Sequence, residues 1–436
     1  MGAVTNTYVD YSVLGNDYNH ATFTDGAYTS ATKTLVKAGA FTHNKAGHRI
    51  YLSSNDGGSI VAGLYTIATW TDADTIILAT DAGAGVDDDA AKCIQHDGTA
   101  ALPWNTIQGA MDLITRDAVN GDQINVVAGT AVVNYATLNI TAYGTPAEGA
   151  PLLIRGCTAI ANDGGIGEID CNGAALAAAT WVMSLCDLEI HNFGNNNGIT
   201  TYGSIVHCEV HKGASAPAGK ALITTCQTIG CYVHDSGGTG TGISNPVIAA
   251  YNYVYNCPTG IGLTSYNVAM HNIVVDCAIG ITCNQDQASV IGNTVYNSLA
   301  STGVGIHGSI NASYTRTIVL NNIVEGYNGA GGDGIYSIGD IGLLGYNALY
   351  SNTNPETLGD VHFDLGNDTA PAASPFTNAV GGDFSLDTTV AGAIDTAFPF
   401  TWYGPAGTAN HADMGAVQNP AGAAGGISMP RVRVGH

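Results

Sequence analysis

The sequence is poor in charge, and poorest in positive charge. Charged residues make up 11% of its 436 residues, and 12 Lys and Arg stand against 35 Asp and Glu, which gives a net charge of −23. A protein this acidic repels nucleic acid and anionic membrane surfaces, so we expect neither as a partner. A polyanionic substrate such as pectate is disfavoured for the same reason. Residues 157–350 hold only three basic side chains, Lys212, Lys220 and Arg316.

Several patterns that mark common protein classes are also missing. No apolar run approaches the length of a membrane span, so we expect no membrane insertion. Residues Met1 to Thr7 have neither the basic start nor the apolar stretch of a secretory signal, so we expect synthesis in a cytoplasm. The ten Cys form no CxxC pair, and the sequence has no nucleophile elbow and no phosphate-binding loop. These absences predict no bound cofactor.

What the sequence does contain is a repeat. Short β-prone runs broken by Gly and Asn recur along the middle of the chain, each centred on one aliphatic residue. The central residues are Ile190, Val210, Val233, Val254, Val274, Val295, Val324 and Leu349. Their spacings of 20, 23, 21, 20, 21, 29 and 25 residues are typical of a stacked solenoid, in which each repeat contacts only its neighbours. A weaker Gly-Ile signal follows most repeats, as at Gly260-Ile261 and Gly280-Ile281.

Within each repeat apolar and polar residues alternate, which predicts a half-buried strand. The central residue then faces the interior. The residue two places before it does so too, because strand residues two apart share a face. In five consecutive repeats this second position holds Asn252, Asn272, Asn293, Asn322 and Asn347. Buried amides must be hydrogen-bonded, so we expect these five side chains to bond to one another in a ladder. Two earlier repeats hold Cys208 and Cys231 there, which we expect to be stacked, buried thiols, with a disulfide between them as the alternative.

These patterns predict an all-β fold, a single-stranded right-handed parallel β-helix solenoid. A leucine-rich horseshoe is excluded, because it needs regular Leu and a helical segment in every repeat. Ahead of the solenoid, residues 1–96 hold short strands separated by Gly or Asp and predict a small β domain. Apolar residues at 107, 110, 111, 114 and 118 suit one face of a short helix, which we expect to cap the first coil.

Motifs at the two ends of the solenoid carry a resemblance to a known family. They are Asp97-Gly98-Thr99 and Leu102 to Ala110 at the start, and Phe376-Thr377-Asn378, Asp383 to Leu386 and Asp413 to Gln418 at the end. Together with the repeats they resemble the pectin-lyase-like β-helix proteins, and within these the appendage and spike proteins of bacteriophage virions. The resemblance covers residues 97–418. It implies a fold more firmly than a function, because this fold hosts many activities.

The same observations predict a division of the chain. We expect a β-rich attachment module in 1–96, a lead-in segment with the capping helix in 97–121, the β-helix in 122–352, a closing segment in 353–418, and a Gly/Ala linker with a basic tail in 419–436. Two of the twelve basic residues, Arg431 and Arg433, lie in the last eight positions. Residues 427–436 are therefore either a docking peptide for an acidic or β-edge partner or a frayed tail.

Ionisable side chains gather at the outward positions beside the central residues. Stacking of adjacent repeats places Glu189 beside Glu209, and it places His191, His211 and His234 in a second column. Three interpretations are open. The two glutamates could be the acid/base pair of a glycosidase, since retaining enzymes hold two carboxyls about 5–5.5 Å apart and stacked carboxylates raise one pKa. The histidines, with the glutamates, could bind a metal ion. Otherwise they form an ordinary surface ladder, exposed or covered by a neighbouring subunit.

A set of tyrosines continues along the same outer face. It comprises Tyr232, Tyr253, Tyr255, Tyr296 and Tyr350. Tyr rings stack on sugar rings, and rigid aromatic rings serve well at protein interfaces. Glycan binding and a subunit interface are therefore both open, beside the simpler interpretation that exposed Tyr is a normal strand residue.

The resemblance and the absences lead to one functional hypothesis and one enzymatic alternative. A third class, a secreted adhesin or surface-layer protein, is disfavoured by the missing secretory signal. We expect a non-enzymatic structural protein of a phage virion, a spike, fibre or head-decoration subunit that is located in the virion. Its expected partners are further copies of itself in a homotrimer, other virion proteins bound through the N-terminal module or residues 427–436, and a host surface glycan. The alternative is a tailspike-type depolymerase, a glycoside hydrolase or lyase that cleaves a neutral or weakly charged polysaccharide with Glu189 and Glu209.

Overall fold

The structure of the chain is a computed structural model. It describes residues 5–9, 22–23, 26–39, 49–52, 60–61, 63–83, 86–87, 91–92, 107, 110–111, 119, 121–129, 132–133, 138, 151–173, 175–178, 183–193, 197–212, 221–224, 227–285, 287–299, 301–309, 316–366, 368–387 and 389–390. The chain forms two compact units. The first comprises residues 1–133, 139–144 and 155–168, and the second comprises residues 134–138, 145–154 and 169–436.

The first unit contains a small antiparallel sheet, as the sequence predicts. Its strand order is β2-β9-β5-β6-β7-β4-β3-β8. The strands are β2 (Thr22–Phe23), β3 (Ala27–Thr29), β4 (Thr34–Val36), β5 (Arg49–Leu52), β6 (Gly63–Asp72), β7 (Thr75–Leu78), β8 (Val86–Asp87) and β9 (Ala91–Lys92), with a 3-10 turn, η2 (Ser30–Thr32), after β3. Alternate strand residues such as Leu35, Ile67 and Ile76 share one face and form its buried core.

The same unit also holds a parallel strand pair. β1 (Thr5–Val9) pairs along its whole length with β10 (Asp122–Val127), so the first described residues do not join the antiparallel sheet. Ile107, Ala110 and Met111 are helical and buried, at three of the positions expected to face the core. The rest of the expected capping helix lies outside the described residues. In the described part of the chain no helix combines the length and the apolar character needed to cross a membrane.

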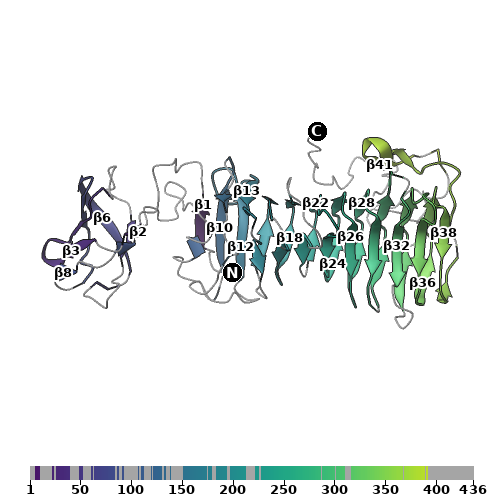
Figure 1. The fold of residues 1–436 in the computed structure, drawn as a ribbon, viewed down its shortest axis with the longest axis horizontal. Helices are drawn as coiled ribbons and strands as arrows, with labels where there is room; N and C mark the ends of the chain where they lie inside the picture. Colours follow the sequence, from purple (N-terminus) through teal and green to yellow (C-terminus); the bar gives the residue numbers. More distant parts are fainter. Residues whose placement is uncertain are drawn as a thin grey trace. The chain divides into compact units, whose positions relative to one another are not determined.

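The second unit is a parallel β-solenoid of about 8 turns (Figure 1), which confirms the predicted solenoid. Each turn gives one short strand to each of three sheets. In this unit the first sheet comprises β15 (Met183–Cys186), β18 (Ser204–Val206), β21 (Gln227–Ile229), β24 (Ile248–Ala250), β27 (Val268–Met270), β30 (Ser289–Ile291), β33 (Thr317–Leu320), β36 (Ile341–Gly345) and β39 (Val361–Asp364). The second, called here the β16–β37 sheet, comprises β16 (Leu188–His191), β19 (Glu209–His211), β22 (Tyr232–His234), β25 (Tyr253–Tyr255), β28 (Ile273–Val275), β31 (Thr294–Tyr296), β34 (Ile323–Glu325) and β37 (Ala348–Tyr350). The third comprises β14 (Ala177–Ala178), β17 (Ile199–Thr200), β20 (Ile223–Thr224), β23 (Thr241–Ser244), β26 (Thr259–Leu263), β29 (Ile279–Cys283), β32 (Val304–Ser309), β35 (Asp333–Ser337) and β38 (Asn354–Thr357).

The aliphatic residues that define the repeat line up in register along the β16–β37 sheet. Ile190 pairs with Val210, Val210 with Val233, and so on through Val324, which pairs with Leu349. All of them are buried. The interior of the solenoid is therefore filled by the column that the spacing predicts.

Sharp left-handed bends lie on both sides of six of the eight strands in the β16–β37 sheet. Tyr251 and Asn256 flank β25 with φ values of 58° and 50°, and His271 and Asp276 flank β28 with 53° and 52°. This left-handed conformation is uncommon outside Gly, and Asn and Asp tolerate it best. The second bend of most turns carries Asn or Asp, which explains why the repeat so often ends in one of these residues.

The asparagine ladder forms as predicted. Each side-chain amide donates to the side-chain carbonyl of the Asn one turn later, over 2.9, 2.9, 3.1 and 3.0 Å from Asn252 through to Asn347. Each amide also donates to a backbone carbonyl of an earlier turn, as Asn252 does to Thr228 at 2.9 Å. All five side chains are buried, so the network leaves these interior amides satisfied. Cys208 and Cys231, at the same position in earlier turns, are buried free thiols.

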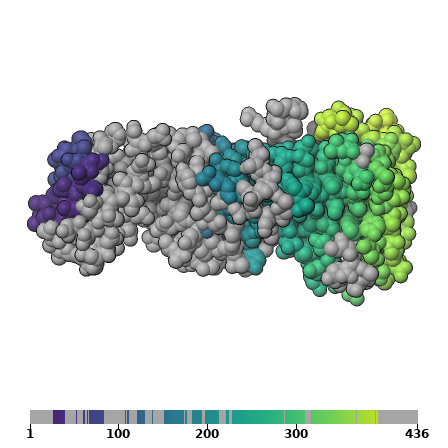
Figure 2. Space-filling view, in the orientation of Figure 1, coloured from purple at the N-terminus to yellow at the C-terminus, as the bar shows by residue number. Residues whose placement is uncertain are grey.

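A C-terminal hairpin packs on the outer face of the β16–β37 sheet. It comprises β40 (Phe376–Asn378), the 3-10 turn η3 (Ala379–Gly381) and β41 (Asp383–Leu386). Its apolar side chains form one buried cluster with residues of β28, β31, β34 and β37. In Figure 2 the last described residues of the chain, in yellow-green, lie against the green residues of the solenoid. The outer face is thus divided into a part covered by the hairpin and a part that it leaves open, the latter on β16, β19 and β22.

Candidate functional site

The part of the outer face left open by the hairpin carries the glutamates and histidines that the sequence singles out. The register pairs Glu189 with Glu209, and His211 with His234. Because side chains alternate along a strand, the glutamate and the histidine of one strand lie on the same outer face, on either side of the buried aliphatic residue. The predicted neighbourhood of these residues is therefore confirmed, while their chemical role stays a prediction.

The histidine side chains form a stack along this face. The rings of His191 and His211 lie 5.3 Å apart at 12°, and those of His211 and His234 lie 4.7 Å apart at 15°. Tyr232 extends the stack, because its ring lies 4.3 Å from that of His234 on the same strand. The spacing follows the distance between neighbouring strands, about 4.8 Å, so the backbone itself sets the separation of the rings.

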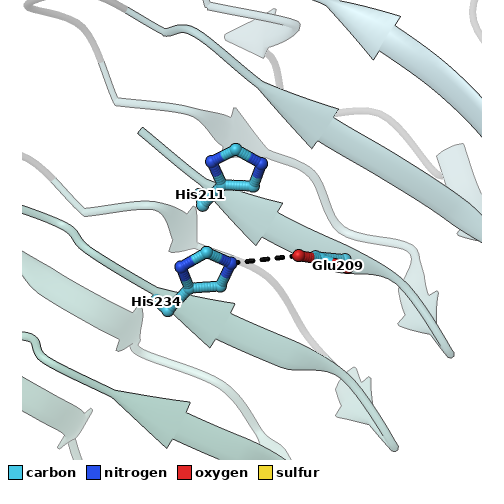
Figure 3. Close-up of side chains that lie close together, drawn as sticks. All are labelled: Glu209, His211 and His234. Atoms are coloured by element: carbon cyan, nitrogen blue, oxygen red, sulfur yellow. Dashed lines mark hydrogen bonds and ion pairs between the residues drawn. The ribbon is translucent and has the colours of Figure 1, made fainter. Parts of the chain in front are cut away.

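Each glutamate pairs with a histidine of the following turn. Glu189 Oε1 lies 3.5 Å from His211 Nε2, and Glu209 Oε1 lies 3.1 Å from His234 Nε2 (Figure 3). The other ring nitrogen of His234, Nδ1, lies 2.8 Å from Asp235 Oδ2. His234 is therefore held between two carboxylates, and with both nitrogens protonated it donates a hydrogen bond to each.

These pairings decide the direction of two pKa shifts. The hydrogen bond from His211 lowers the pKa of Glu189. The predicted rise in the pKa of one stacked carboxyl is therefore not found at Glu189, because the hydrogen-bond partner of Glu189 is the imidazole of His211. Burial opposes the charge of His234, but its hydrogen bonds to Glu209 and Asp235 outweigh burial and raise the pKa of this imidazole.

The tyrosines do not form one open column. Tyr232 contacts Tyr253 edge to face, with ring centroids 5.5 Å apart. Tyr253 and Tyr255 pack against the cluster beneath the hairpin, and Tyr296 is buried within it. We expected the side chain of Tyr296 to be available to a glycan or a subunit on the outer face. This expectation is wrong, because the hairpin covers the ring, and the ring centroids of Tyr296 and Phe384 lie 5.6 Å apart. Tyr350 is half-buried. Contacts of Tyr232 and Tyr350 with a glycan or a second subunit stay predictions.

An open hollow of about 690 Å³ follows the bend after the β16–β37 sheet. Its lining includes Asp235, Asn256, Asp276 and Asn297, one from each of four successive turns, and Ser301 and Thr302 from the loop after β31. The Asn256 amide donates to the Asp235 carboxylate, and the Ser298 hydroxyl donates to Asp276 at 2.8 Å. This surface was not predicted from the sequence. The signal was the Asn or Asp that ends five of the eight repeat units.

No protein-family model and no curated protein matches the chain. The parallel β-solenoid is therefore established by the structure itself, and the function has to be inferred from its surface.

Proposed function

We propose that this protein is a structural, non-enzymatic rod of a bacteriophage virion, a spike, fibre or head-decoration subunit that presents a β-helix for attachment to a surface. The observation that carries the proposal is the continuous parallel stack of strands, with its interior filled by the aliphatic column and the asparagine ladder. Such an interior resists bending and local opening, because each turn is hydrogen-bonded to the next through backbone and side chains. The resemblance to pectin-lyase-like β-helix proteins and phage appendages supports the virion assignment.

The surface of the rod suits recognition of an uncharged or weakly charged partner. Asn, Asp, Ser and Thr line the hollow beside the β16–β37 sheet, and Tyr232 borders the open part of the outer face. Neutral glycans are recognised by hydrogen-bonding side chains together with aromatic rings on which sugars stack. A host surface glycan is therefore the ligand that we propose for the rod.

The first experiment measures assembly. Size-exclusion chromatography with light scattering on the full chain is expected to give a homotrimer. Immunogold labelling of phage particles from a strain that encodes the chain is expected to mark an appendage or the capsid surface. A stable monomer that labels no particle would contradict the proposal.

The pairing of Glu189 with Glu209 favours one second candidate, a tailspike-type depolymerase acting on a neutral or weakly charged polysaccharide. A glycosidase needs one carboxyl that stays protonated as an acid, whereas the pKa of Glu189 is lowered. In this candidate Glu189 is therefore the ionised partner of the pair. Release of reducing ends from host capsule or lipopolysaccharide that stops in both Glu189→Gln and Glu209→Gln would establish the depolymerase. Equal release by the unaltered chain and both variants would remove it.

A further inference from the structure

Three potential ligands for a metal ion converge on β19 and β22. Glu209, His211 and His234 each offer one ligand atom, and these atoms all lie within 4.8 Å of one another (Figure 3). We propose that Glu209, His211 and His234 form a binding site for a divalent transition metal ion of the zinc class. The site does not depend on a virion role for the protein.

The ligand set selects the class of metal. Two imidazoles and one carboxylate form one of the recurrent three-residue sets for Zn²⁺, with a fourth position left to water or another ligand. Imidazole also suits Cu²⁺ and Ni²⁺. Ca²⁺ and Mg²⁺ prefer six or more oxygen ligands, which a site with two nitrogens does not supply. The site is therefore expected to discriminate against these hard cations.

The distance between two of the ligands already fits a shared metal. Zinc bonds of about 2.0–2.1 Å at a tetrahedral angle place two ligand atoms about 3.3 Å apart. His234 Nε2 and Glu209 Oε1 lie 3.1 Å apart. A proton holds these two atoms together when no metal is bound, and a metal ion in its place needs little movement of either side chain.

Asp235 completes the arrangement around His234. Its Oδ2 lies 2.8 Å from Nδ1 and accepts the proton on that nitrogen. This contact leaves the Nε2 lone pair directed at the position between His234 and Glu209. Metal-ligating histidines nearly always donate their second ring N–H to such a carboxylate or carbonyl, which fixes the tautomer and the ring orientation.

Metal binding requires His211 to give up its contact with Glu189. Without metal its Nε2 lies 3.5 Å from Glu189 Oε1, a long contact on the side away from His234. Rotation of the ring toward His234, one strand away, replaces this weak contact by a metal bond. The side chains of His211 and Glu209 are 20% and 38% exposed, so an ion from solvent can reach them.

The backbone fixes the relative positions of the three ligand residues. β19 and β22 are held by parallel pairing in which Glu209, Val210 and His211 face Tyr232, Val233 and His234. Both central valines are fully buried, which fixes the strands on which the ligands stand. A bound ion would join two consecutive turns and stabilise the folded solenoid by mass action.

The experiment uses the full chain, treated with a chelator and then titrated with Zn²⁺ by calorimetry and with Co²⁺ by visible absorption. We expect one ion per chain and the intense visible bands of a tetrahedral Co²⁺ site. His234→Ala, His211→Ala and the near-isosteric Glu209→Gln are expected to weaken binding by more than about 100-fold, and Asp235→Asn by about 10–100-fold.

Two histidines provide matched controls. His191→Ala removes a ring of the same stack, and His207→Ala removes an exposed histidine that pairs with Asp187 at 3.8 Å. Neither is expected to change Zn²⁺ affinity by more than about twofold, a few tenths of a kcal/mol. Absence of stoichiometric binding would overturn the proposal, as would a loss in His191→Ala equal to that in His234→Ala. If a histidine variant fails to fold, the Zn²⁺ affinity of Glu209→Gln tests the proposal instead.

Discussion

The side-chain amide of Asn347 donates a 3.0 Å hydrogen bond to the carboxylate of Asp368, and this contact ends the asparagine ladder. From one asparagine to the next, the side-chain amide donates to the side-chain carbonyl of the following turn, so the last partner of the ladder only has to accept. An ionised carboxylate is the side chain that accepts without donating. Burial raises the pKa of Asp368 above its ordinary value, and its bonds to the backbone and side chain of Asn347 offset only part of that rise. The ladder therefore ends on a buried carboxyl group whose cost of ionisation its own donors reduce.

Removal of one amide from the middle of the ladder should destabilise the solenoid. Asn293→Ala leaves the Asn272 amide and backbone N–H without their shared acceptor, since each donates to Asn293 Oδ1 over 2.9 and 3.0 Å. Buried unsatisfied groups cost about 1–3 kcal/mol each, so we expect a loss of roughly 3–6 kcal/mol in the free energy of unfolding. Denaturant unfolding checks this. The control is the exposed Asn328→Ala, which is expected to change stability by less than about 0.5 kcal/mol.

The hairpin should detach without unfolding the solenoid when its central ring is removed. Phe384 is 4% exposed and contacts Tyr296 and Phe376 with centroid distances of 5.6 and 5.4 Å. Phe384→Ala is expected to remove about 3–5 kcal/mol of packing free energy. This loss weakens the docking of the hairpin on the solenoid. Limited proteolysis should then cleave near residues 374–387 while the rest of the solenoid resists. Val380→Ala, at an 84% exposed position of the same hairpin, should behave as the unaltered chain does.

The interior of the solenoid could be predicted because it repeats. The docking of the C-terminal hairpin could not be predicted, because its residues belong to no repeat. The registered column from Val210 to Val324 and the five asparagines follow from the period and from alternation alone. Phe376 and Phe384 lie outside any repeat, so the sequence did not indicate that they would cover Tyr296. The stacking of Glu189 on Glu209 was predictable from the register. The contact of each glutamate with the histidine of the next turn depends on side-chain direction, which the spacing of residues does not specify.

Rising pH should loosen the hairpin through Glu325. Burial raises the pKa of this carboxyl to about 7, and the Ser374 hydroxyl in the closing segment donates to it at 2.9 Å. In the unfolded chain its pKa returns to about 4.3. The folded state therefore binds more protons between these values. The protonated group contributes its full stability below about pH 4, and this contribution falls as pH rises through 7.

Glu325→Gln removes this dependence on pH. The variant keeps a polar group beside Ser374 but has no charge to bury, so it should exceed the unaltered chain in stability by up to about 3 kcal/mol at pH 8. At pH 5 the gain should be much smaller. Hydrogen exchange of residues 374–387 at the two pH values measures it, because these residues report on docking of the hairpin. An equal difference at both values would show that Glu325 titrates normally in the folded protein.

Two glycines of one strand should respond in opposite ways to the same substitution. A Cβ on Gly260 of β26 would lie 2.6 Å from both the Gly280 carbonyl oxygen and Val274 Cγ1, whereas a Cβ on Gly262 would meet nothing closer than 3.6 Å. The weak Gly-Ile signal in the sequence thus marks the place where the third sheet approaches the buried valine column. Gly260→Ala is expected to cost about 1–3 kcal/mol through overpacking, and more if the backbone cannot move. Gly262→Ala should be neutral or stabilising by about 0.5 kcal/mol, because it only reduces the freedom of the unfolded chain. Thermal unfolding of the pair checks both signs, and equal destabilisation would show that strand β26 tolerates no side chain at either position.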